Sequence, residues 1–344
     1  MIHVEALLEV EAALAAAQAE RGLIPVEHAR TIAQACSAGV DVDAEAARVS
    51  TPVVPLVAAL REAVGEDAAA SVHLGATSQD VMDSAAMLVV RERRGPIVEN
   101  LAGAANTAAD LARAHRSTPM AGRTLLQHAR PITFGAKAAL WMAALDDAGR
   151  GLAHVALPAQ LAGPVGTLDD EDLVRAFADR LDLDAPALPW HTARAPVTRI
   201  AAALGIAAGV AGKVATDVVL LAQTEVGEVR EEGGEGYGGS SAMPHKHNPI
   251  AAISARAAAR RAPGLVATLL ACMEQEHERA AGAWQAEWPA LDGLLAVTGE
   301  ACARAREALE RLVVDPGRMR ANVGEEDVDV ADAEALVDRA LDSR

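Results

Sequence analysis

The feature that most constrains this chain is an apolar repeat with alternating steps of four and three residues. It occupies seven positions: Ile200, Leu204, Ala207, Ala211, Val214, Val218 and Leu221. This spacing is typical of a bundle helix that packs along one face. A second repeat runs through Ile97, Leu101, Ala104, Ala108 and Leu111. Because helices of about 30 residues are roughly 45 Å long, we expect these helices to pack against partner chains as well as within their own chain.

The composition favours an all-α fold. Of the 344 residues, 51% are apolar but only 2% are aromatic. The core must therefore be built from Ala, Val and Leu, which suit closely packed helices better than a β-sandwich. We predict further long helices over residues 250–284 and 290–313, and a loop over residues 50–57 that contains two prolines.

The chain is long enough for two or three domains. We predict an N-terminal helical domain over residues 1–94 and a central long-helix bundle over residues 95–322. Residues 323–344 are expected to be the remnant of a C-terminal domain, beginning with an acidic, solvated run.

Charge and cysteine content exclude several kinds of partner. The formal charge of −17 argues against nucleic acid, because phosphate binding needs clustered Lys and Arg. The cysteines at positions 36, 272 and 302 form no CxxC pair, which indicates a reducing cytoplasm without disulfides. No uncharged run reaches the roughly 20 residues that span a bilayer, and the N-terminus carries Glu5 and Glu9 where a secretory signal is basic and then apolar. We therefore expect a cytoplasmic protein with no membrane partner.

The stretch GGSSAMPHKHNPI, from Gly238 to Ile250, concentrates polar chemistry in a mostly apolar chain. Asn248 followed by Pro249 predicts a helix start, with Asn as the N-cap and Pro at the first helical position. Lys246 then lies ahead of a helix N-terminus, which favours an anion. Five glycines lie among residues 233–239, so the stretch indicates either a loop that closes over a carboxylate or an ordinary flexible connection.

Two earlier stretches are also polar. HLGATSQD, from His73 to Asp80, matches a capping box through Thr77 and Asp80; alternatively, the hydroxyls of Thr77 and Ser78 bind a substrate carboxylate at that helix start. GRTLLQHARPITFG, residues 122–135, precedes a new helix and reads as a binding segment or as a polar loop. Its polar residues are Arg123, Thr124, Gln127, His128 and Arg130.

Taken together, the motifs TSQD, GRTxxQxAxPxTxG and GSSxMPxKxNP resemble the three signature regions of the fumarase/aspartase superfamily. The resemblance covers about residues 5–322, and residues 51–85 look most like the 3-carboxy-cis,cis-muconate cycloisomerase branch. It implies an all-α, long-helix bundle that forms a homotetramer, with each active site built from three subunits and without a cofactor. Superfamily members usually continue further beyond the RMRANV segment, so we expect a shortened C-terminal domain.

The resemblance also implies roles for individual residues. A serine of the GSS loop would transfer a proton at a carbon next to a carboxylate, namely Ser240, with Ser241 as the less favoured choice. His73 would position substrate or relay a proton, and a purely structural role is an equal alternative. The residues expected to bind substrate are Thr77, Ser78, Arg123, Thr124, Gln127, His128, Met243, Lys246 and Asn248.

Leu125 is an informative departure from the superfamily pattern. Many lyases of the superfamily read GRTHxQ, where the histidine protonates a leaving amine or hydroxyl. A carboxylate, with a pKa of about 4, leaves or adds without such an acid. Leu125 therefore favours lactone formation, and the expected activity is cycloisomerisation of 3-carboxy-cis,cis-muconate, a small tricarboxylate, to a carboxymuconolactone.

Other readings of the sequence remain. A lyase that expels another weakly basic anion, such as nitrite from a nitrosuccinate, tolerates Leu125 equally, and an adenylosuccinate lyase-like activity shares the first motif. A non-catalytic structural member is a third reading, against which the intact Ser240 and Lys246 argue. His245 and His247 form an HxH pair, but no third ligand follows at a suitable spacing, so we expect no metal.

Overall fold

The computed structural model describes residues 3–42, 51–234, 236–243, 246–324 and 328–344 of the chain. The chain forms two compact units, each built from three separated segments. The first unit contains Met1–Arg93, Val155–Ala201 and Ala267–Asp292, and the second contains Arg94–His154, Ala202–Val266 and Gly293–Arg344. The division into three continuous domains stays a prediction.

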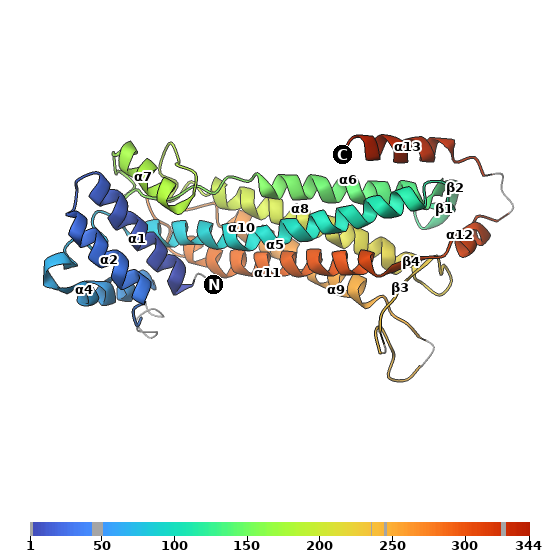
Figure 1. The fold of residues 1–344 in the computed structure, drawn as a ribbon, viewed down its shortest axis with the longest axis horizontal. Coiled ribbons are helices and arrows are strands. Elements are labelled where there is room, and N and C mark those ends of the chain that lie inside the picture. The colour runs from blue at the N-terminus through green and yellow to red at the C-terminus, as the bar shows by residue number, and fades with distance from the viewer. Residues whose placement is uncertain (1–2, 43–50, 235, 244–245, 325–327) are drawn as a thin grey trace. The chain divides into compact units, whose positions relative to one another are not determined.

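Helices dominate both units (Figure 1). The first unit holds α1 (Val4–Glu20), α2 (Val26–Ala38), α4 (Val53–Ala69) and α7 (Glu171–Leu181). The second holds α6 (Phe134–Ala153), α9 (Ile250–Ala259), α12 (Pro316–Val323) and α13 (Ala331–Asp342). Four helices contribute residues to both units: α5 (Ser78–Ala114), α8 (Ala195–Leu221), α10 (Ala262–Ala271) and α11 (Ala283–Glu310). The predicted all-α class is confirmed.

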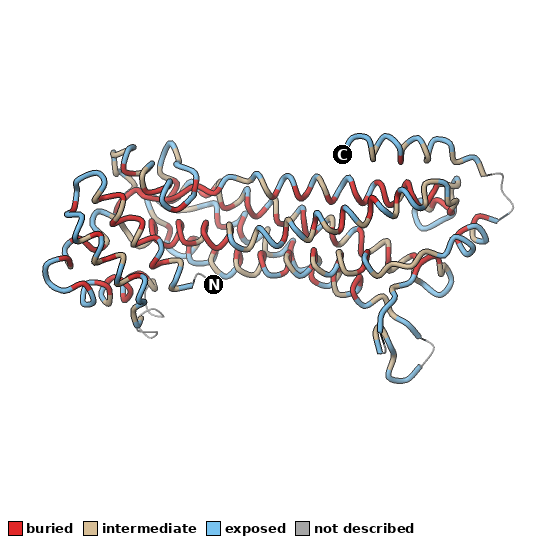
Figure 2. The backbone as a smooth tube through the Cα atoms, in the orientation of Figure 1, coloured by how far each residue is buried: buried red, intermediate tan, exposed pale blue. Residues whose placement is uncertain are grey.

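The apolar repeats form the buried faces of α5 and α8, which Figure 2 shows as red turns along these helices. All seven repeat positions of α8 are at most 5% exposed. In α5 the first four repeat positions are buried, and Leu111 is half-buried. The spacing of four and three therefore identified the core side of both helices correctly.

Among the described helices, only α8 is long and apolar enough to cross a membrane. Length and composition alone are a weak criterion, since the core helix of a soluble protein meets it too. The seven repeat positions of α8 are buried and contribute to the protein's own core.

Three predicted segments differ from the structure, and a proline lies in or beside each. The loop predicted over 50–57 is mostly the start of α4, because prolines are tolerated in a first helical turn whose N–H groups have no intrahelical partner. The helix predicted over 250–284 is two shorter helices, α9 and α10, with a turn at Arg260 and Arg261 just before Pro263, and residues 272–282 are not helical. Proline removes a helix hydrogen bond and collides with the preceding turn. In contrast, α11 begins at Ala283 and continues through Pro289, so it extends further towards the N-terminus than predicted.

Two small antiparallel sheets were not predicted. β1 (Pro119–Thr124) pairs with β2 (Gln127–Thr133), and β3 (Val229–Glu231) pairs with β4 (Leu312–Val314). Gly122 lies at an irregularity of the first pair, where a Cβ would come within 2.3 Å of the Arg130 carbonyl oxygen. Only glycine fits there. Strands β1 and β2 carry the second motif, and β3 leads into the third.

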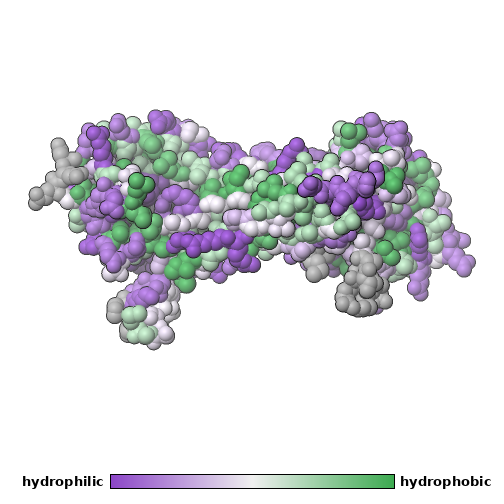
Figure 3. Space-filling model, turned by 180° about the vertical axis from the view of Figure 1, so that it is seen from behind, coloured by the Kyte–Doolittle hydropathy of each residue, from purple (hydrophilic) through white to green (hydrophobic). Residues whose placement is uncertain are grey.

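Large apolar side chains are also exposed on helices of the second unit. Leu140 of α6 is 59% exposed, Ile206 of α8 57% and Ile253 of α9 39%. Figure 3 shows such apolar areas, in green, among polar ones on one face of the molecule. Exposed apolar side chains mark a surface that meets another protein where they form a continuous patch.

Candidate active site

The first motif begins α5 in the first unit. The Thr77 N–H donates to the Asp80 carboxylate at 3.0 Å, which is one of the two reciprocal hydrogen bonds of a capping box. Asp80 is 1% exposed and also accepts from the N–H groups of Ala162 and Gly163 and from His191 Nε2. Asp80 is therefore a structural anchor of this helix start. Within the described part of the chain, no hydrogen bond occupies the hydroxyls of Thr77 and Ser78, which remain candidates for binding substrate.

Arg279 lies beside this motif and was not selected from the sequence. Its Nε donates to Gln79 Oε1 at 3.2 Å, and its NH2 group donates to the Pro164 carbonyl at 3.0 Å. Gln79 is itself fully buried. The only sequence signal was a charged run, EQEHER, and such runs usually mark a solvated surface.

His73 precedes the first motif in a left-handed backbone conformation, with φ of 61°. Its Nδ1 lies 2.6 Å from Glu11 Oε1, and Glu11 is 1% exposed. A left-handed conformation is uncommon for a residue other than glycine, and it persists only where its surroundings hold it. The pairing with Glu11 gives His73 a structural partner, and its catalytic role stays a proposal.

The second motif forms the β1–β2 hairpin of the second unit. Arg123 makes two hydrogen bonds to Glu228, at 3.0 and 2.6 Å. The Glu228 side chain is fully buried, whereas that of Arg123 is 21% exposed. Asn322 of α12 donates to the same carboxylate at 2.8 Å. The Arg123 guanidinium, expected to bind substrate, is thus engaged inside its own chain.

The hairpin tip is strained and exposed. Leu125 and Leu126 have φ of 51° and 64° and are 97% and 77% exposed. Two-residue turns of this kind favour Asn-Gly, because side chains without a local hydrogen bond cost about 1–2 kcal/mol per residue in the left-handed region. The flanking residues Thr124, Gln127 and His128 are exposed as well. The second motif therefore presents its binding candidates at a projecting tip.

Lys137 follows the hairpin in the first turn of α6. Burial lowers the pKa of its ammonium, and the nearby Lys213 and Arg123 act in the same direction, whereas Asp217 opposes them. Its Nζ is 3.9 Å from Asp217 Oδ2, an oxygen that also accepts from the Trp141 indole at 2.7 Å. Asp217 is thus shared between Lys137 and Trp141, and it offsets the positive charge of Lys137 only in part.

The third motif is a loop of the second unit between β3 and α9. Ser240 Oγ accepts hydrogen bonds from the N–H groups of Ala242 and Met243 at 3.4 and 3.3 Å. Ser241, Met243 and Lys246 are exposed, and Ser240 is half-buried. The metal hypothesis that was weighed for the HxH pair involves His245, which lies outside the described residues. No group of three metal-ligating side chains occurs within the described ranges.

Asn248 is not the N-cap of the following helix. Pro249 occupies that position, and α9 begins at Ile250. The backbone N–H and the side-chain amide of Asn248 both donate to the Gly238 carbonyl, at 2.8 and 2.9 Å. These two hydrogen bonds join the two ends of the loop. The N-cap prediction was wrong because Pro249, and not Asn248, holds that position.

Glu231 occupies the helix N-terminus that was expected to attract a substrate anion. Its carboxylate accepts from the N–H groups of Ala251 and Ala252, at 3.0 and 2.8 Å. These are the free donors of the first turn of α9, and a carboxylate is the kind of group they favour. These two donors of the helix end are therefore already occupied by Glu231 and not free for a substrate anion.

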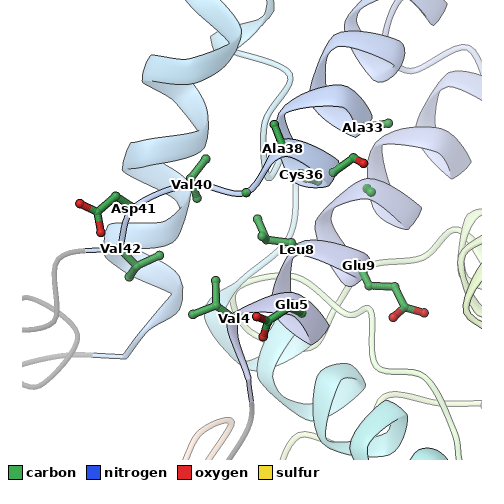
Figure 4. A pocket seen from close by; sticks show the side chains of 13 residues that line it. Val4, Glu5, Leu8, Glu9, Ala33, Cys36, Ala38, Val40, Asp41 and Val42 are labelled. Atoms are coloured by element: carbon green, nitrogen blue, oxygen red, sulfur yellow. The ribbon is translucent and has the colours of Figure 1, made fainter.

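A cavity of about 730 Å³ lies between α1 and α2 of the first unit (Figure 4). None of its lining residues belongs to the three motifs. Leu8, Ala33 and Val40 give it apolar walls, and Glu5 and Glu9 are acidic residues of its lining. Burial above all raises the pKa of the Cys36 thiol in its wall to about 12, so that thiol is unreactive. No predicted site residue lines the cavity.

The motifs match known proteins over most of the chain. Residues 2–264 match the model of a family described as lyase. A 3-carboxy-cis,cis-muconate cycloisomerase of Bradyrhizobium diazoefficiens is 46% identical over 332 residues, which cover 92% of this chain and 74% of the relative. A nitrosuccinate lyase of Streptomyces davaonensis is 44% identical over 340 residues, covering 92% of this chain and 72% of the relative.

A solved structure resembles the fold described above. The 3-carboxy-cis,cis-muconate lactonizing enzyme of Pseudomonas putida has a TM-score of 0.86 and 40% identity, over 94% of this chain and 75% of that one. Together with the three motifs and the long-helix fold, these matches confirm the resemblance inferred from the sequence. The chain is therefore a member of the lyase family, within the fumarase/aspartase superfamily.

Proposed function

We propose that this protein is a cycloisomerase that converts 3-carboxy-cis,cis-muconate to a carboxymuconolactone. The similarity to relatives of that name over nearly the whole chain carries the proposal. The exposed Leu125 at the hairpin tip supports it, because this position offers no acid for a leaving amine or hydroxyl. The reaction needs no such acid, since the group that adds or leaves is a carboxylate.

The chemistry is a carbon–oxygen bond formation coupled to a proton transfer. A carboxylate oxygen of the substrate adds to one carbon of the diene, and the displaced π electrons move to the neighbouring carbon. That carbon takes a proton from a serine hydroxyl, which solvent then restores. In the reverse direction the same serine, as an alkoxide, removes the proton next to a carboxylate.

Ser240 suits this role better than Ser241. Two backbone N–H groups already point at its Oγ, and such donors stabilise an alkoxide as it forms. Lys246 adds positive charge to the same loop, and the hydroxyls of Thr77 and Ser78 would bind a substrate carboxylate at the start of α5. Gln127, at the hairpin, would bind a second carboxylate.

The active site is proposed to form between subunits of a homotetramer in the cytoplasm. The first motif belongs to the first unit, and the other two belong to the second. The superfamily resemblance implies that each site takes one motif from each of three chains. Exposed apolar residues such as Leu140 and Ile206 support assembly through the long helices.

Elimination of nitrite from a nitrosuccinate is the second candidate function. A relative of that name is almost as similar as the cycloisomerases, and nitrite also leaves without an acid. The two reactions share the proton transfer by serine and differ in the group expelled.

The decisive experiment offers the purified protein both substrates. We expect loss of the conjugated diene absorbance with 3-carboxy-cis,cis-muconate and no release of nitrite from nitrosuccinate. Ser240→Ala should reduce kcat by about a hundredfold or more, the usual contribution of a positioned proton-transfer group. Ser241→Ala is the matched control and should retain most of the activity. A helical, well-folded protein that leaves the diene unchanged would rule the cycloisomerase function out.

A further inference from the structure

The base of the loop that carries Ser240 is organised around one carboxylate. Glu231, the last residue of β3, accepts from two N–H groups of α9. It also accepts from the hydroxyl of Tyr237, at 3.0 Å. Glu231 thus connects three parts of the second unit: a strand, the loop and the helix that follows the loop.

Tyr237 is the only tyrosine of the chain and lies three residues before Ser240. The Arg311 guanidinium lies 4.6 Å from the centre of its ring, a distance at which a cation is attracted to an aromatic face. A Cβ on Gly233 would come within 2.3 Å of the ring, so only glycine allows the ring to lie there. The ring therefore lies against both Arg311 and Gly233, and its hydroxyl donates to Glu231.

Arg311 is itself fixed to the body of the second unit. It follows α11, and its Nε donates to Glu307 at 3.0 Å. Its backbone carbonyl accepts from the Glu232 N–H at 2.8 Å as an extension of the β3–β4 pairing. Tyr237 therefore rests on a part of the structure that is built from helix and strand.

The serine loop is defined as the described residues 236–243 and 246–248, and Tyr237 is its second residue. Gly236 and Gly238 flank Tyr237 with φ of 84° and 68°, values that glycine adopts readily. The Gly238 carbonyl then accepts both hydrogen bonds of Asn248. The position of Tyr237 thus sets where both ends of the serine loop leave the body of the unit.

We propose that Tyr237 and Glu231 are positioning residues, whose hydrogen bond holds the serine loop so that Ser240 meets its substrate in a reactive geometry. This inference rests on the proposed function only for the identity of the substrate. Neither residue touches the reacting atoms; both act through the backbone that carries Ser240. The half-buried phenol is consistent with this arrangement, since burial and then Glu231 raise its pKa to about 12.

The test replaces Tyr237 by Phe, which keeps the ring and removes only the hydroxyl. We expect kcat on 3-carboxy-cis,cis-muconate to fall about 5- to 10-fold while KM changes less than about 2-fold, because misplacing a catalytic group weakens the transition state more than binding. Amide hydrogen exchange at Ala242 and Met243, measured in the full-length protein, should become faster. Glu231→Gln, which keeps an acceptor for the hydroxyl, should lose less activity than Glu231→Ala.

A matched control removes another hydroxyl of the second unit. Thr107 donates to the Gly103 carbonyl within α5 at 3.2 Å, and Thr107→Val should change neither the exchange nor the kinetics. Unchanged kcat in Tyr237→Phe would overturn the proposal, whether or not the thermal midpoint shifts. If the wild type turns over neither substrate, the proposed function fails. The positioning role is then decided by amide exchange alone: faster exchange at Ala242 and Met243 in Tyr237→Phe supports it, and unchanged exchange overturns it.

Discussion

The ion pair between Arg123 and Glu228 makes a quantitative prediction about Arg123→Met. The carboxylate of Glu228 is fully buried, and without the guanidinium the Asn322 amide is its one remaining side-chain donor among the described residues. Breaking one side of a buried pair costs about 3–5 kcal/mol, because a charge is left without compensation. For a unit of this size that loss lowers the thermal midpoint by roughly 10 °C.

Urea unfolding followed by circular dichroism measures the effect on Arg123→Met, Glu228→Gln and the double variant. We expect the double variant to be more stable than the sum of the single losses predicts, by about 2 kcal/mol, since removing both charges leaves no unpaired ion. The control is the exposed pair of Arg113 and Asp110, in which the side chains are 56% and 80% exposed. Arg113→Met should cost less than about 1 kcal/mol.

The opposite outcome would show that Arg123 meets the substrate. In that case Arg123→Met keeps the wild-type unfolding midpoint and raises KM for the carboxylate substrate. Such a result refutes the structural role derived from Glu228 and restores Arg123 to the binding site, as its motif suggested.

Two further predictions concern single features of the second unit. Because Tyr237 is the only tyrosine, tyrosinate absorbance reports its titration directly. Its folded pKa of about 12 exceeds the ordinary value of 10.0, so its contribution to stability is complete below pH 10.0 and is lost as the pH rises through about 12. Glu231→Gln should move the pKa of Tyr237 towards 10.0. An unchanged pKa in this variant would contradict the hydrogen bond between Tyr237 and Glu231. Replacing Leu125 and Leu126 by Asn and Gly should stabilise the second unit by about 1–2 kcal/mol in urea, since these residues suit the turn; an equal or lower stability means that the turn is not strained.

The parts of the fold that follow from local periodicity could be predicted. The repeat in α8 fixes its buried face because helix geometry places steps of three and four on one side. The two helices where one was expected, α9 and α10, depend on Pro263, and propensity does not say whether a proline kinks, ends or begins a helix. The β3–β4 sheet escaped notice because three-residue strands carry too few positions for an alternating pattern. Strands β1 and β2 are longer, but buried and exposed residues do not alternate along them.

The site was predictable as a set of motifs and not as a set of contacts. The motif residues and their order pointed to the family, which the comparisons confirm. The partner of Arg123 lies 105 residues away in sequence, and nothing in the spacing identifies it. Asn248 before Pro249 is a common helix start, yet Pro249 holds the N-cap position and the Asn248 amide instead donates to the Gly238 carbonyl. The roles of Ser240, Ser241 and His73 stay predictions.

The short strand β3 has a consequence for how this protein can diverge. Glu228, just before it, holds the hairpin of the second motif, and Glu231, at its end, holds the serine loop. Val229 between them is 4% exposed, so the strand cannot rotate without disturbing the core. A substitution that adapts the hairpin to a new substrate by shifting β3 also displaces the serine loop. The two motifs are therefore expected to change together in evolution, and directed evolution of specificity should select paired substitutions around this strand.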